Sequence, residues 1–197
     1  MAIFGLALTG VVVLAGCAWV YMSSSIETPD YQVESSDGAI ETRRYPAFVV
    51  AEVIRRGDRY TAVRNGFGPL AGYIFAKERA GEKIAMTAPV TQRRREEGAA
   101  DWTVQFIMPA QYSLADLPAP VQGDVTLTEE PPARRAAIRF SGVATDELIA
   151  EQEGLLRAWL AEKGLTPLGA PIYAYYNDPF TPGFLRRNEV LIDLADG

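Results

Sequence analysis

Residues 47–74, AFVVAEVIRRGDRYTAVRNGFGPLAGYI, hold the pattern that decides the fold. The first eight residues are mostly apolar and rich in β-branched side chains, which is typical of a buried strand. Asp58 then stands where a helix N-cap belongs, and apolar residues recur after it at spacings of three and four. We therefore predict a strand followed by an amphipathic helix. Gly68 and Pro69 predict a kink or break in that helix, because proline has no backbone N–H to donate.

Around this strand and helix, the same order of elements occurs twice along the chain. Predicted strands in the first half cover residues 31–35, 40–45, 47–54, 85–92 and 102–108, and the charged run at 93–98 predicts a solvated hairpin tip. The second half predicts strands at residues 124–130, 134–140, 172–176 and 189–194, and a helix from a Thr145 cap to Gly164. The fold class that we predict is α+β: a distorted antiparallel β-barrel built from two βαββ-like halves, with two flanking helices.

The composition excludes several classes of function. The net charge is −6, so the chain has little electrostatic support for binding nucleic acid. It contains no histidine and a single cysteine, Cys17. Catalysis by Ser-His-Asp or Cys-His groups and zinc sites built from Cys and His are therefore excluded. We expect no enzymatic activity, no metal site and no internal disulfide.

The N-terminal segment differs from the rest of the chain. Residues 2–22 carry no charge and are long enough to cross a bilayer as a helix. Within them, Leu14-Ala15-Gly16-Cys17 resembles the lipobox of bacterial lipoproteins, in which the cysteine is lipidated after cleavage of the signal. The alternative is an uncleaved signal anchor, favoured by the lack of a basic n-region. We divide the chain into a lipoprotein signal or transmembrane anchor (1–22), a polar linker (23–30) and one folded domain (31–197).

Several short stretches resemble the SOUL/heme-binding-protein family. They are RYPAFVVA at residues 44–51, the segment from Phe67 to Ile74, KIAMTAPV at 83–90, FSG at 140–142, PFTP at 179–182 and RRNEV at 186–190. The resemblance implies the distorted barrel described above and the binding of heme or a related tetrapyrrole. We interpret MTAPV and RRNEV as framework, in which Arg186, Arg187 and Glu189 form a partly buried ion-pair network.

The family's proposed heme site lies against the first helix. Carried over position by position, the resemblance implies a ligand-binding surface made of Val63, Arg64, Phe67, Leu70 and Ala71, with Arg59 in reach of a second carboxylate. Apolar side chains one turn apart offer a flat surface, and Arg64 can pair with a carboxylate through two hydrogen bonds. The alternative is that the apolar residues are ordinary core and that Arg64 is a solvated surface charge.

Without histidine, the residues left to ligate heme iron are Met86, Met108 and the tyrosines. We therefore expect heme to bind weakly or without strong ligation, and a metal-free porphyrin, a bilin or another planar apolar anion fits equally well. Two other functions stay open, a scaffold or interaction domain without heme and a small-molecule sensor. We expect a monomer that binds a small hydrophobic ligand and no nucleic acid. Its N-terminal segment would tether it to a membrane of the bacterial cell envelope, with the domain facing the periplasm.

Overall fold

The computed structural model describes residues 26–77, 79–96, 98–121 and 123–195. The elements run in the order β1 (Gln32–Asp37), β2 (Ile40–Tyr45), β3 (Phe48–Arg56), α2 (Arg59–Ile74), β4 (Val90–Arg94), β5 (Asp101–Ile107), β6 (Thr126–Glu130), β7 (Ala133–Phe140), α3 (Asp146–Glu162), β8 (Pro167–Tyr175), the 3₁₀ turn η1 (Gly183–Leu185) and β9 (Asn188–Leu194).

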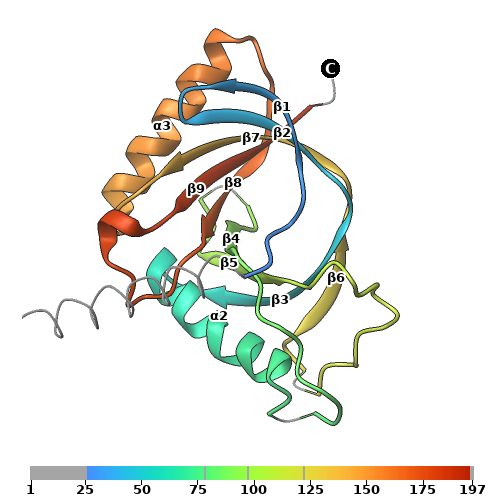
Figure 1. Ribbon diagram of the computed structural model, residues 1–197. Coiled ribbons are helices and arrows are strands. Elements are labelled where there is room, and N and C mark those ends of the chain that lie inside the picture. Colours follow the sequence, from blue (N-terminus) through green and yellow to red (C-terminus); the bar gives the residue numbers. More distant parts are fainter. Residues whose placement is uncertain (1–25, 78, 97, 122, 196–197) are drawn as a thin grey trace, which may run out of the picture.

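The nine strands form one antiparallel sheet, which curls strongly in Figure 1. The order across the sheet is β1-β2-β7-β9-β8-β4-β5-β3-β6. This confirms the predicted α+β class with two flanking helices. The described strands do not close a barrel, because β1 and β6 lie at opposite ends of that order and do not pair with each other.

The βαββ units of the two predicted halves are β3-α2-β4-β5 and β7-α3-β8-β9, and these units meet where β4 pairs with β8. Each βαββ unit also pairs with one strand from the other half of the chain. The strand β2 belongs to the first half of the chain but pairs with β7 of the second unit, and β6 belongs to the second half but pairs with β3 of the first unit. This exchange of strands holds the two halves together in one sheet.

Successive strand residues face opposite sides of the sheet, and the two sides differ in chemistry. Both helices lie on the outside of the curl in Figure 1. The outer face therefore carries the two main core clusters, which join Val104 and Phe106 of β5 to Leu70 of α2, and Ile192 of β9 to Leu156 of α3. The inner face carries a smaller apolar cluster, arginines and carboxylates.

Helix α2 begins as the sequence predicts but is not broken at Gly68. The Oδ1 atom of Asp58 accepts a hydrogen bond of 2.8 Å from the backbone N–H of Thr61, which confirms the predicted N-cap. The helix then continues through Pro69 to its last turn. The proline leaves the carbonyl of Asn65 without its usual partner, and the Nε of Arg55 donates to that oxygen at 3.2 Å.

The strand predicted at residues 85–92 is wrong in its bounds, since β4 begins only at Val90. One reason is Pro89, which cannot donate a ladder hydrogen bond. The same strand extends into the predicted hairpin tip, because Arg93 pairs with a residue of β8 and Arg94 with a residue of β5.

The predicted signal or anchor (1–22), its Cys17 and the first residues of the linker lie outside the described residues. Within the part of the chain that the structure describes, no helix combines the length and apolar character needed to cross a bilayer.

Candidate ligand-binding site

The exposed side of α2 carries a stripe of three residues, Tyr60, Arg64 and Phe67. Their spacings of four and three place them on one side of the helix. Tyr60 is 65% exposed and Phe67 is 43% exposed, so two aromatic rings face solvent on either side of a cationic residue. We call this set the α2 stripe.

The stripe lies on a well-packed base. The ring of Phe67 meets the ring of Phe106 on β5 edge to face, with 5.2 Å between their centroids. Val63, one turn before Phe67, is partly buried and packs against the core cluster under α2. Val63 and Phe67 are therefore held in place by the residues beneath them, while the outer surface of Phe67 stays exposed.

Arg64 is exposed, and its guanidinium has no partner within the described residues. Arg55 on the neighbouring strand, by comparison, forms a salt bridge of 2.6 Å with Asp124. A free guanidinium offers five N–H donors in a planar fork, which matches the two oxygens of a carboxylate. The stripe can thus bind an apolar ring and an acidic group together.

Arg59 lies in the interior and does not belong to this surface. Its Nε atom is 2.6 Å from an oxygen of Asp146, and its other two nitrogens donate to Tyr175 and to the carbonyl of Ala144. Burial by itself lowers the pKa of Arg59, but Tyr175 and Asp146 outweigh burial and raise it. The residue joins the first turns of α2 and α3, so its charge serves the fold.

Leu70 and Ala71 are also buried in the core cluster under α2. Of the six residues that the resemblance implies, the structure therefore brings Val63, Arg64 and Phe67 together near the surface. Arg59, Leu70 and Ala71 contribute to packing instead. For Leu70, this agrees with the alternative that the apolar residues are ordinary core. Tyr60 belongs to the surface and was missed as a ligand residue, although its spacing of seven from Phe67 indicates a shared face.

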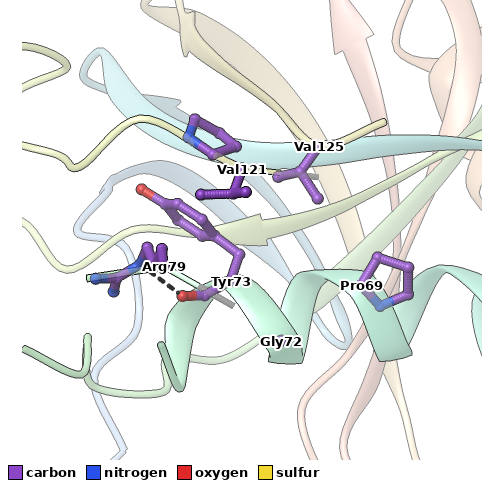
Figure 2. Close-up of a pocket in the computed structure, with 7 residues that line it drawn as sticks. Pro69, Gly72, Tyr73, Arg79, Val121 and Val125 are labelled. Atoms are coloured by element: carbon purple, nitrogen blue, oxygen red, sulfur yellow. Dashed lines mark hydrogen bonds between the residues drawn. The ribbon is translucent and has the colours of Figure 1, made fainter. Parts of the chain in front are cut away.

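A shallow pocket with about 240 Å³ of empty space, part of it open to solvent, lies on the other side of α2, and Figure 2 shows six of its residues with labels. It is lined by Pro69, Gly72, Tyr73, Arg79, Pro120, Val121 and Val125. The Nε of Arg79 donates to the carbonyl of Tyr73 at 2.9 Å, and its other nitrogens donate to two more carbonyls. Because this guanidinium is occupied at the end of α2, the pocket lacks a free group that would recognise a ligand.

The ion-pair network predicted near the C-terminus is present with one change of member. Glu189 is buried and lies 2.7 Å from Arg187 on one oxygen and 2.7 Å from Arg43 on the other. Burial alone would raise the pKa of Glu189, but the two arginines outweigh it and hold that pKa below its usual range. Arg186 stays outside the network and donates to the carbonyls of Thr181 and Pro179.

The two methionines considered as iron ligands are poorly placed. Met108 is buried, and Met86 is partly buried against the core cluster under α2. Among the described residues, no group of three or more His, Cys, Asp or Glu side chains could hold a metal ion. Of the side chains considered as iron ligands, Tyr60 is the one that belongs to the α2 stripe, and it is exposed.

The family model described as SOUL heme-binding protein matches residues 26–193. The chain belongs to the SOUL family. Heme-binding protein 2 of Homo sapiens is 29% identical to this SOUL chain over 185 residues, covering 88% of each protein. The Mus musculus protein of the same name is 29% identical over 177 residues, covering 84% of this chain and 85% of the relative.

Solved structures share the fold of this SOUL chain at low sequence identity. The EcmrR C-terminal domain aligns with a TM-score of 0.62 at 14% identity, over 85% of this chain and 99% of that domain. A hydrolase from Listeria innocua aligns with a TM-score of 0.58 at 11% identity, over 82% of this chain and 94% of the hydrolase. At these identities the likeness concerns the fold alone.

Proposed function

We propose that this SOUL-family chain is a binding protein, not an enzyme, and that it binds heme or a related tetrapyrrole on the α2 stripe. The observation that carries the proposal is the unpaired guanidinium of Arg64 between the exposed rings of Tyr60 and Phe67. Family membership supports the ligand class, and the two relatives named heme-binding protein 2 agree with it.

The physical basis is apolar burial combined with one charge-assisted contact. Each 100 Å² of apolar surface removed from water contributes roughly 2.5 kcal/mol, before the cost of immobilising the ligand. The edge of the macrocycle carries carboxylates, and Arg64 can hold one of them through two parallel hydrogen bonds. An open surface of this kind is suited to reversible binding.

Heme brings its own iron chemistry, and the chain's residues contribute stacking surface and carboxylate pairing. Because the sequence has no histidine, the contribution of iron ligation to affinity should be small. The proposal therefore expects a metal-free porphyrin to bind about as tightly as hemin.

The test is a titration of the full chain, held in nanodiscs, with hemin and with protoporphyrin IX, using empty nanodiscs as the blank. Absorbance and tryptophan quenching should report saturable binding of both ligands. Arg64→Ala should weaken binding by about tenfold or more, because it removes a charged hydrogen bond. Phe67→Asp should weaken binding further. Arg95→Ala, which removes an exposed arginine from the tip between β4 and β5, is the matched control.

If both α2 variants bind the ligands as tightly as the wild type does, the α2 stripe is not the binding site. If neither ligand binds saturably to the wild type, the interaction or sensor domain becomes the better account.

We also propose that residues 2–22 tether the domain to a membrane of the bacterial cell envelope, with the domain facing the periplasm. Support comes from the uncharged composition of the segment and from the lipobox-like sequence that ends at Cys17. The intact mass of the membrane-extracted protein distinguishes the two forms of tether. Loss of sixteen residues with added acyl mass means a lipoprotein, a full-length mass means an uncleaved anchor, and recovery of the chain only in the soluble fraction contradicts tethering.

A further inference from the structure

The inner face of the curled sheet borders a cleft with about 410 Å³ of empty space, part of it open to solvent. The cleft lies on the side of the sheet away from the helices. Its lining residues are Pro29, Tyr45, Phe48, Pro89, Thr91, Arg93, Gln105, Ile107, Glu130, Arg135, Ile172, Ala174, Tyr176 and Leu191. The family resemblance implies no role for these residues as a set.

Most of the wall is apolar or aromatic. Tyr45, Ile172 and Leu191 belong to the apolar cluster of the inner face, with Phe48 and Tyr176 packed against it. The hydroxyls of the two tyrosines form hydrogen bonds within the protein, since Tyr45 accepts from Arg43 and Tyr176 donates to Glu189. These side chains therefore offer rings, not hydroxyl groups, to an occupant.

Two arginines, Arg93 of β4 and Arg135 of β7, both line the cleft and both reach Asp193 of β9. Each forms a single hydrogen bond within the described residues, and both bonds go to Asp193, at 3.2 Å and 2.7 Å. A guanidinium has five N–H donors, so most of these donors have no protein partner. No buried side-chain nitrogen of the described residues lacks a hydrogen bond. The nitrogens left without a partner must therefore be accessible, and the cleft is the space that both side chains line.

The nearest remaining acceptor does not satisfy these donors. The Oε2 atom of Glu130 is 3.8 Å from Arg93 and 3.9 Å from Arg135, beyond hydrogen-bond distance for both. The other oxygen of Glu130 accepts from Gln105 at 2.8 Å. Each of the two guanidiniums therefore keeps N–H donors without a protein acceptor, while Asp193 and Glu130 balance their charges.

We infer that this cleft is a second ligand site, which binds a flat apolar carboxylic acid of one or two rings. The rings of Tyr45, Phe48 and Tyr176 would contact the ligand's body, and Arg93 and Arg135 would donate to its carboxylate. Arg135 is well suited to the task because it is more than nine-tenths buried and is positioned over the rings of Tyr45 and Phe48 at 5.2 Å and 5.8 Å.

This site is independent of the proposed tetrapyrrole site. The α2 stripe stands on the helix that covers the outer face, while the cleft opens on the inner face of the same sheet. An acid that fills the cleft should therefore leave tetrapyrrole binding unchanged, and failure of either proposal leaves the other intact.

The experiment compares three ligands of the same shape on the full chain in nanodiscs: 2-naphthoate, 2-naphthamide and 2-naphthylmethylammonium. Ligand fluorescence should show saturable binding of the anion, with the neutral and cationic ligands at least tenfold weaker. This ranking needs no variant, so it stands even if a substitution disturbs folding. Equal binding of all three ligands, or tighter binding of the cation, would overturn the inference.

Variants then locate the bound acid. Arg93→Gln, at a partly exposed position, should weaken 2-naphthoate by tenfold or more, whereas Glu130→Gln should leave it as tight or tighter because a competing negative charge is lost. Arg64→Ala should leave 2-naphthoate unchanged and weaken only protoporphyrin IX. Loss of naphthoate binding in Arg64→Ala with no loss in Arg93→Gln would place the acid on the α2 stripe and refute the cleft.

Discussion

The two faces of the sheet are stabilised in different ways although the same strands build both. On the outer face, residues such as Val104 and Ile192 are fully buried under the helices, and apolar burial holds the structure together. On the inner face, Glu189 and its two arginines form a buried ionic network beside a cleft that stays partly open. The comparison shows that the inner face can carry buried charged groups because apolar packing on the outer face supplies most of the core.

The strongest test of this difference is a truncation on the outer face. Trp102 is almost fully buried, its ring lies 6.1 Å from that of Tyr173, and its Nε1 donates to the carbonyl of Gly57. Trp102→Ala should lower the free energy of unfolding by about 3–5 kcal/mol. Urea unfolding measures the loss. Leu155→Ala, at a position of α3 that is 51% exposed, is the control and should change stability little.

On the inner face, the free energy of unfolding should fall when a charge of the buried network is removed without changing the size of the side chain. Glu189→Gln keeps the shape of the side chain but leaves Arg43 and Arg187 without their buried counter-charge. The expected loss is about 3 kcal/mol, since removing one partner of a buried pair leaves an unpaired charge. Glu34→Gln, which alters a surface ion pair, should cost much less in the same unfolding experiment. Equal losses would mean that the inner network contributes no more than surface pairs do.

The same network predicts how stability depends on pH. The pKa of Glu189 is lower in the folded protein than its usual value of 4.5. Its contribution is therefore fully present above about pH 4.5 and is lost as the pH falls through the folded pKa. Thermal unfolding between pH 3 and pH 7 should show a loss of stability on acidification that is smaller in Glu189→Gln. A variant with the same acid dependence as the wild type would contradict this assignment.

A smaller loss of stability is expected when the N-cap of α3, a helix that covers the outer face, is removed. Thr145 accepts a hydrogen bond from the N–H of Leu148 at the start of α3. Thr145→Ala should cost about 1 kcal/mol, because one donor of the first turn loses its partner. Thr145→Ser keeps the hydroxyl and should restore most of the stability; if both variants lose the same amount, the cap is not the cause.

Local signals in the sequence were sufficient for most of the fold. These signals each depend on a few neighbouring residues, and the structure confirms them: the caps at Asp58 and Thr145, the apolar spacing of α2 and the order of the strands along the chain. The continuous helix through Pro69 was not predictable in the same way. The carbonyl that the proline leaves free accepts a hydrogen bond from Arg55, which is fourteen residues before Pro69 in the sequence and lies on another element.

The ligand surface was only partly predictable for a similar reason. Spacing places Arg64 and Phe67 on one side of a helix, but it does not tell how deeply neighbouring strands bury each position. Leu70 and Arg59 share the periodicity of the site and are buried by contacts with distant elements. The cleft was not predictable from the sequence, because Arg93 and Arg135 come from strands of different halves with β8 and β9 between them, and they meet at Asp193 only in the folded sheet.

The most direct test of the proposed function is chemical-shift mapping of the isotope-labelled chain during a titration with protoporphyrin IX. The largest shifts should fall on Tyr60, Val63, Arg64 and Phe67 along α2, and the residues of the inner cleft should shift little. Shifts centred on Tyr45, Arg93 and Tyr176, with α2 unchanged, would contradict the assignment of the tetrapyrrole to the α2 stripe.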